Sequence, residues 1–196
     1  MMARIHVDID DTIADTTSTF IDFMIHKYKF KINKEELNDH AYNKIICSLM
    51  KKDKDFFREF EKSNFFNKIK PVKNSQKIIS NLAKNNELIL ISGRPLNLLE
   101  GTKKWIEKYF PNCFLEIYLI NQYPRAGEEK GPRKFELCKK LNCSFSIEDD
   151  AISALSLAEL GVNVLLFNQP WNKNANLNRN ITRVSTWHEV NNLLNK

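Results

Sequence analysis

The chain lacks the sequence features of membrane, secreted and zinc-binding proteins. No apolar run comes near the roughly 18 residues that a transmembrane helix needs, and the N-terminus leads straight into an apolar stretch without a signal-peptide region or cleavage site. The four cysteines form no Cys-x-x-Cys pair and the four histidines are scattered, so buried thiols are favoured over a zinc site. We therefore expect a cytoplasmic protein with no membrane partner.

What the chain does have is the composition of a protein with a buried core. It has 196 residues, of which 42% are hydrophobic and 28% are charged, and this length fits one domain with a possible small insert. The net charge of +6 comes from dispersed lysines. Such a charge suits an anionic substrate or a nucleic acid, although a solvated basic surface explains it equally well.

The rest of the chain is organised around residues 2–13, MARIHVDIDDTI. The apolar part predicts a buried strand, which ends in Asp8, Asp10 and Asp11. Asp8 and Asp10 project to the same side of an extended chain, and two like charges so close need a cation or a shared proton. Oxygen-only ligands suit Mg²⁺. A solvated acidic turn, with Asp11 capping a helix, is the alternative.

Strands and helices alternate along most of the chain. Apolar runs predict strands at 2–7, 87–91, 114–120, 144–147 and 162–167, and helical spacing predicts helices at 16–28, 34–50, 53–62, 74–84, 95–110, 132–141, 152–160 and 187–194. The segment 168–186 has no periodicity and is expected to be an Asn-rich loop. Alternation of this kind predicts an α/β fold with a doubly wound parallel sheet.

Residues 16–70 differ from the rest because they contain three predicted helices and no credible strand. We expect them to form a small α-helical cap inserted after the first strand, with residues 1–15 and 71–196 as the α/β core domain. Pro71 marks the return to the core. Most phenylalanines of this insert have helical spacing and are expected to pack its interior rather than stack on a ligand.

Two further strand ends carry polar residues. Ser92, Gly93 and Arg94 follow the second strand, where a hydroxyl and free backbone N–H groups can hold a phosphate; an ordinary strand-to-helix turn is the alternative. A second acid cluster, 148–150, follows the strand at 144–147. The two acid clusters can serve one site only if their strands are neighbours in the sheet.

In this order, over the whole chain, these pieces resemble the motifs of the haloacid dehalogenase-like phosphatases. The resemblance makes Asp8 the nucleophile and Asp10 the general acid and base. It makes Ser92, with Gly93 and Arg94, the turn that binds the phosphoryl group.

The same resemblance assigns the basic and acidic residues in the second half of the chain. Lys134 matches the catalytic lysine of the family, with Lys130 as its rival, and the resemblance implies that Lys134 binds the substrate phosphate and, with Ser92, stabilises its oxygens. Glu148 and Asp149 match the acidic motif, with Asp149 favoured as a metal ligand and the role of Asp150 left open.

The family chemistry implied is Mg²⁺-dependent hydrolysis of a phosphate monoester through an aspartyl-phosphate intermediate. The metal would be held by Asp8, Asp149 and the backbone carbonyl of Asp10, with a contribution from Glu148 left open. Asp10 would have to start the reaction protonated, so its pKa is expected to be raised by its neighbours.

The substrate is less well defined by sequence. The IEDD and VLLFNQPWN stretches and the small cap resemble the nucleotidase branch, which includes the 5′(3′)-deoxyribonucleotidases, and imply a nucleoside monophosphate. The Ser-Gly-Arg turn followed by Thr102 and Trp105 also resembles polynucleotide 3′-phosphatases. A sugar phosphatase and a non-catalytic nucleotide-binding protein are further alternatives. Trp171 is expected to pack its loop onto the sheet, with contact to a ligand as the other possibility.

Overall fold

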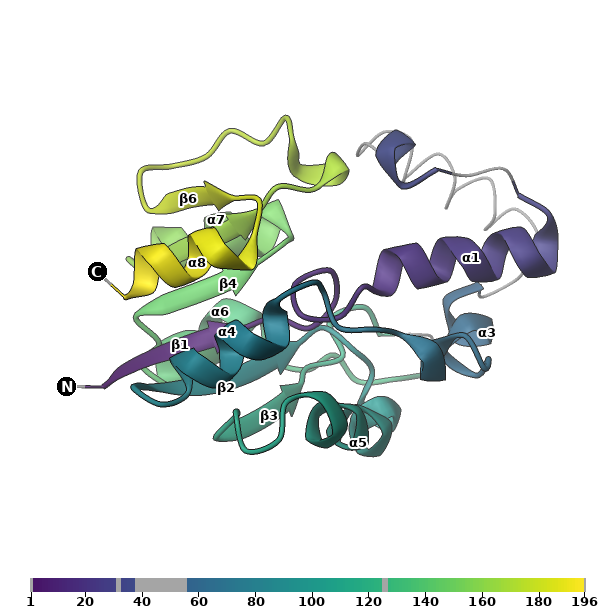
Figure 1. The fold of residues 1–196 in the computed structure, drawn as a ribbon, viewed down its shortest axis with the longest axis horizontal. Helices are drawn as coiled ribbons and strands as arrows, with labels where there is room; N and C mark the ends of the chain where they lie inside the picture. The colour runs from purple at the N-terminus through teal and green to yellow at the C-terminus, as the bar shows by residue number, and fades with distance from the viewer. Residues whose placement is uncertain (1, 31–32, 38–55, 125–126, 196) are drawn as a thin grey trace.

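The computed structural model describes residues 2–30, 33–37, 56–124 and 127–195. In this part of the chain, six parallel strands form one sheet with the order β3-β2-β1-β4-β5-β6 (Figure 1). The strands are β1 Ala3–Val7, β2 Asn86–Ser92, β3 Glu116–Leu119, β4 Phe145–Glu148, β5 Asn163–Phe167 and β6 Ile181–Val184. The predicted α/β fold with a parallel sheet is confirmed.

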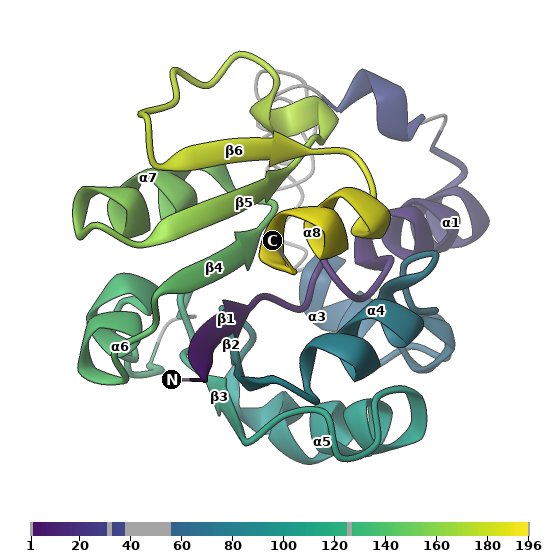
Figure 2. The same cartoon turned by 60° about the vertical axis from the view of Figure 1, so that its left-hand side comes forward.

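Helices cover both faces of the sheet, with α6 and α7 on one side and α4, α5 and α8 on the other (Figure 2). The described α-helices are α1 Thr16–Tyr28, α3 Phe56–Glu61, α4 Ser75–Leu82, α5 Leu99–Tyr109, α6 Lys134–Lys140, α7 Ala151–Glu159 and α8 Trp187–Leu194. Short 3₁₀ turns are η1 Lys34–Glu36, η2 Phe66–Lys68, η3 Leu96–Leu98 and η4 Pro170–Asn172. The predicted helix at 34–50 begins as η1, and its part from residue 38 lies outside the described residues.

The strand β2 shows why the sheet is covered on both faces. Leu88 and Leu90 belong to the apolar cluster that includes side chains of α4, α5 and α8, whereas Ile89 and Ile91 belong to the cluster that includes α6 and α7. Successive side chains of a strand point to opposite faces, so a continuous apolar run requires a core on each side. The run LILI is therefore typical of a central strand.

One strand escaped the sequence-based prediction. The segment 168–186, expected to be a loop, contains β6, which pairs in parallel with β5 from Val164↔Ile181 to Phe167↔Val184. With only four residues, β6 is too short to show a periodic pattern of its own. Its place in the sheet comes from pairing with β5.

The strand order places the site. Because β1 lies between β2 and β4, the ends of these three strands meet at one edge of the sheet. The amide of Asp8 donates to the carbonyl of Ile147 (3.0 Å), which extends the β1–β4 pairing into the first acid cluster. The expectation that the two acid clusters follow neighbouring strands is confirmed.

The helices α1 and α3 lie beyond the carboxyl ends of the strands (Figure 1). Their aromatic rings pack on one another, for example Phe20 stacked on Phe57 (4.8 Å between centroids) and Phe23 against Phe60 (5.6 Å). The two chain crossings to this region run side by side, since Ala14 forms an antiparallel bridge with Pro71. The division into a core, 1–15 and 71–196, and a cap, 16–70, stays a prediction.

Two expectations drawn from what the sequence lacks concern the thiols and membrane helices. Cys113, Cys138 and Cys143 are free and buried, as expected, and Cys47 lies outside the described residues. Among the described helices, none combines the length and the apolar character needed to span a bilayer.

A first prediction concerns Gly131, just before α6, where a Cβ atom would lie 2.1 Å from the carbonyl oxygen of Ile120. The backbone must move to accept a side chain, so Gly131→Ala should lower the free energy of unfolding by roughly 1–3 kcal/mol. Gly101→Ala is the control, because its Cβ would meet nothing within 4 Å on the exposed face of α5; it should leave stability unchanged or raise it by up to about 1 kcal/mol. Urea unfolding measures both, and equal stability of the two variants would contradict the close approach.

Candidate active site

The first acid cluster leaves the sheet where β1 ends. Asp8 is buried, and its Oδ1 lies 3.0 Å from the ammonium of Lys134. Burial raises the pKa of the Asp8 carboxyl, Lys134 opposes this rise, and the nearby Asp10 adds to it. The pair thus joins a carboxylate from the first strand to an ammonium from the start of α6.

Lys134 lies between two acids. Its ammonium is 3.0 Å from Asp8 Oδ1 and 2.8 Å from Glu148 Oε1, and its side chain is only 7% exposed. Burial by itself lowers the pKa of Lys134, but the two carboxylates outweigh burial and raise it above the usual lysine value. The rival Lys130 is exposed in the preceding loop. The structure therefore brings Lys134 to the acid cluster.

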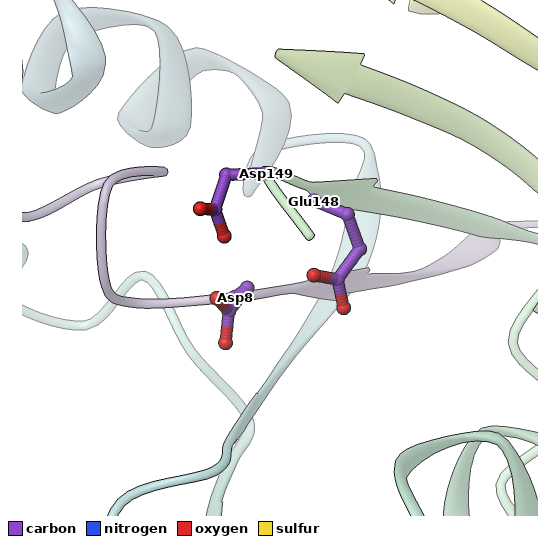
Figure 3. A group of neighbouring side chains, drawn as sticks. All are labelled: Asp8, Glu148 and Asp149. Atoms are coloured by element: carbon purple, nitrogen blue, oxygen red, sulfur yellow. The ribbon is translucent and has the colours of Figure 1, made fainter. Parts of the chain in front are cut away.

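Three carboxyl groups converge beside this lysine. Asp8, Glu148 and Asp149 each offer one oxygen, and these oxygens lie within 4.8 Å of one another (Figure 3). All three residues are buried. Burial and mutual repulsion raise the pKa of Glu148 to about 8 and that of Asp149 well above its usual value. The direction of these shifts means that ionisation of the whole cluster is unfavourable without a further cation.

The donor set fits a hard divalent cation. All the converging groups are carboxylate oxygens, the ligands that Mg²⁺ and Ca²⁺ prefer. Oε2 of Glu148 is buried and has no hydrogen-bond partner among the described residues. Three carboxylates facing one ammonium leave an excess of negative charge, which a divalent ion would neutralise.

Asp10 has a different environment from Asp8. The guanidinium of Arg94 grips its carboxylate, with Nη2 2.6 Å from Oδ1 and Nε 2.9 Å from Oδ2, and the hydroxyl of Thr16 donates to Oδ1 (2.5 Å). Although burial raises the pKa of Asp10, Arg94 and Thr16 outweigh it and lower the pKa. The expectation that the neighbours raise this pKa is wrong for this arrangement, because Arg94 lies beside the carboxylate.

The turn after β2 contains the three residues predicted to bind phosphate. Ser92 is buried at the end of β2, and its Oγ accepts from the amide of Arg94 (3.3 Å). The carbonyl of Gly93 accepts from the amide of Gln122 (3.0 Å). The guanidinium of Arg94 is directed to Asp10, contacts the hydroxyl of Thr102 (3.2 Å) and lies over the Phe66 ring. Arg94 therefore connects the turn to Asp10 and to η2.

Two acids at this edge stabilise the local fold. The side chain of Asp150 accepts from the amide of Ser153 (2.8 Å) and caps α7. Asp11 has a positive φ of 55°, and its carboxylate accepts from the amide of Thr17 in the first turn of α1 (3.1 Å). This is the capping role that the sequence left as an alternative for Asp11.

Sequence reasoning missed Lys34 and the contacts of the loop after β5. The ammonium of Lys34, in η1, lies 3.3 Å from Asp15 and 3.5 Å from Asp11. Gln169 donates to the backbone carbonyl of Asp11 (3.1 Å). One lysine among many gives no sequence signal, since only the fold brings η1 over the end of β1.

The sequence of the chain is similar to those of known nucleotidases. The family model of the 5′ nucleotidase, deoxy (pyrimidine), cytosolic type C protein matches residues 1–122, more than half of the chain. A nucleotidase of Clostridium acetobutylicum is 27% identical over 187 residues, covering 95% of this chain and 91% of the relative.

Two solved structures share the fold. A haloacid dehalogenase-like hydrolase of Streptococcus pneumoniae has a TM-score of 0.68 at 12% identity and covers 98% of both chains. The magnesium-bound hydrolase YfnB of Bacillus subtilis has a TM-score of 0.62 at 13% identity and covers 100% of this chain and 99% of that chain. At this level of identity, the likeness establishes the fold alone.

The pairing of Asp10 with Arg94 gives a second prediction. Arg94→Met removes the cation but keeps an apolar stem, so the pKa of Asp10 should rise and stability at pH 7 should fall by roughly 1–3 kcal/mol. A carboxyl group whose pKa is lowered in the folded state stabilises the folded protein at pH values above the usual aspartate pKa of about 3.9. This stabilisation is lost as the pH falls through the folded-state pKa. The difference in free energy of unfolding between wild type and Arg94→Met should therefore become smaller below about pH 4.

Urea unfolding in the presence of a chelator, at pH 7 and at pH 3, measures this difference in the free energy of unfolding. Arg94→Lys is the control, because it keeps the positive charge but loses the bidentate hydrogen bonding to the carboxylate of Asp10. Its free energy of unfolding should lie between those of wild type and Arg94→Met. Equal stability of wild type and Arg94→Met at pH 7 would rule out a stabilising ion pair.

Proposed function

The chain belongs to the 5′ nucleotidase, deoxy (pyrimidine), cytosolic type C family within the haloacid dehalogenase-like hydrolases, and we propose that it hydrolyses nucleoside monophosphates with the help of Mg²⁺ and an aspartyl-phosphate intermediate. As a member of this family it is a hydrolase of phosphoric monoesters. The observation that carries the proposed mechanism is the convergence of Asp8, Glu148 and Asp149 within 4.8 Å beside Lys134.

The proposed metal ligands are Asp8, Asp149 and the backbone carbonyl of Asp10, with Glu148 close enough to contribute. When bound, Mg²⁺ would neutralise charge on the phosphate and on the nucleophile, which otherwise repel each other. The choice of Mg²⁺ is supported by the all-oxygen donor set and by the magnesium-bound relative of the same fold.

Asp8 is the proposed nucleophile. Its carboxylate attacks phosphorus, a bond forms between a carboxylate oxygen and phosphorus, and the ester bond to the leaving alkoxide breaks. Lys134, 3.0 Å away, reduces the negative charge that the phosphate dianion meets on approach. Water then cleaves the aspartyl-phosphate and releases inorganic phosphate.

Asp10 is the proposed general acid and base. It gives a proton to the leaving alkoxide and later takes one from the attacking water, a role worth about 10²–10⁴-fold in rate. Since Arg94 keeps Asp10 ionised in this arrangement, Asp10 has to gain a proton once substrate is bound. A phosphate dianion beside Ser92 would offer Arg94 another anionic partner, which reconciles the predicted phosphate contact of Arg94 with its present pairing.

A nucleoside monophosphate is favoured as substrate by the family and by the Clostridium acetobutylicum nucleotidase. The alternatives from sequence, a polynucleotide 3′-phosphate end and a sugar phosphate, require the same chemistry at phosphorus. They differ in what lies beyond the phosphate. The net charge of +6 would favour a polynucleotide only if binding weakened steeply with added salt.

The third prediction tests function and mechanism together. With Mg²⁺, the protein should release phosphate from nucleoside monophosphates faster than from sugar phosphates or a 3′-phosphorylated oligonucleotide.

Two variants test the mechanism. Asp8→Asn should abolish turnover with an intact fold, and Asp10→Asn should lower the rate of phosphate release by about 10²–10⁴-fold. Colorimetric phosphate release measures the rates and circular dichroism checks the fold. Activity of Asp8→Asn equal to wild type would exclude Asp8 as nucleophile, and a preference for the oligonucleotide would change the substrate class.

The fourth prediction concerns the metal. Because a ligand that binds only the folded state stabilises it, Mg²⁺ at 100 times its Kd should raise the free energy of unfolding by about 2.7 kcal/mol. Asp149→Asn should lose this response. It should not destabilise the metal-free protein, because it removes one of several crowded buried acids.

Asp150→Asn is the matched control. It weakens the cap of α7 and should lower stability slightly, but should keep the full Mg²⁺ response. Thermal unfolding with chelator and with Mg²⁺ measures both effects. If Mg²⁺, Mn²⁺ and Ca²⁺ all leave the unfolding temperature of the wild-type protein unchanged, this result would argue against the metal site.

A further inference from the structure

The loop after β5 contacts both acid-bearing loops. Gln169 donates to the backbone carbonyl of Asp11 (3.1 Å), and the buried side chain of Asn172 donates to the carbonyls of Asp149 and Phe167 (2.7 Å each). These bonds attach the turn η4 to the end of β1 and to the end of β4. The loop is therefore part of the scaffold around the carboxylate cluster.

Asn172 is itself fixed from the far side. Arg183 of β6 donates to its side-chain oxygen (2.9 Å) and to its backbone carbonyl (2.7 Å). A turn held by a sheet strand on one side and by an acid-bearing loop on the other is a rigid support. The neighbouring residue of the turn, Trp171, is placed with it.

Trp171 reaches the cluster with its side chain. The indole N–H donates to Oδ2 of Asp149 (3.0 Å). An indole N–H can only donate, so it fixes the orientation of the carboxylate without competing for a cation. The ammonium of Lys34 lies over the indole ring, 5.8 Å from its centroid, so a residue of η1 covers the ring.

We propose that Trp171 is a positioning residue for metal binding: its indole N–H holds the carboxylate of Asp149 in the orientation that the cation requires. The inference rests on the metal site of the proposed function and adds to it a residue that does not bind the metal itself. Partners of this kind, which hydrogen-bond to a metal ligand, alter metal affinity or activity by 10- to 100-fold when removed. A residue that only packed the loop onto the sheet would change stability and leave metal affinity unchanged.

The test is the fifth prediction. Trp171→Phe keeps an aromatic ring but removes the N–H, and it should weaken Mg²⁺ binding to the full chain by about 10- to 100-fold. Isothermal titration of the metal-free protein with MgCl₂ gives the Kd, and urea unfolding of the metal-free protein confirms the fold. Phosphate release should recover at a correspondingly higher Mg²⁺ concentration. Trp171→Leu removes the same N–H with a different side chain and should reproduce the loss of affinity.

Trp105→Phe is the matched control. It also loses an indole hydrogen bond, from Nε1 to the carbonyl of Ile69 (3.0 Å), but that carbonyl belongs to no residue of the carboxylate cluster. Its Kd for Mg²⁺ should equal that of wild type. Wild-type affinity in both Trp171 variants would overturn the role of Trp171 and leave the metal site standing, whereas a wild-type protein that binds no Mg²⁺ would remove the site itself.

Discussion

The three buried acids at one edge of the sheet determine which charged groups can lie beside them. The order of the strands places β1 beside β4, so Asp8, Glu148 and Asp149 leave the sheet at the same edge. Within the described chain, Lys134 is the one lysine or arginine at ion-pair distance from these acids. Without a nearby positive charge, each ionised buried acid costs on the order of several kcal/mol of folding free energy. A cation that completed the cluster would therefore stabilise the fold as well as serve the proposed reaction.

At the same edge, two aspartates that are two positions apart in sequence have different surroundings. Asp8 faces Lys134 and the other acids, and its side chain is 9% exposed, whereas Asp10 is 33% exposed and is held by Arg94. Different environments of this kind are how two carboxyl groups in one site acquire different roles. Asp8 is suited to a fixed position beside the proposed metal. Asp10 can reach solvent and can change its partner, as the proposed general acid and base must do.

Sequence could predict the parts of this arrangement that depend on local pattern. The apolar run before Asp8, the strand before Glu148 and the helix that begins near Lys134 all showed in periodicity, and the family resemblance supplied the order of the motifs. The pairing of Asp10 with Arg94 could not be predicted, because it depends on how the turn after β2 is placed against the end of β1. The strand β6 was missed for a related reason: four residues show no pattern, and the partner strand determines their conformation.

Asp11 links the acid cluster to α1 and η1. Its left-handed backbone turns the chain out of the sheet, and its side chain accepts hydrogen bonds from the amide and the hydroxyl of Thr17 in α1. Lys34 contacts this carboxylate and also covers Trp171, which in turn holds Asp149. A continuous set of contacts therefore connects η1 with the carboxylate cluster.

These contacts add to the two adjacent places where the chain crosses between the core strands and the region of α1 and α3. There the amide of Asp15 donates to the carbonyl of Lys70 (2.9 Å), and Ala14 and Pro71 form an antiparallel bridge. Because Lys34 contacts Asp11, Asp15 and the ring of Trp171, η1 is attached to the core at a third place, separate from the two chain crossings. Movement of α1 and η1 away from the sheet would have to break these contacts.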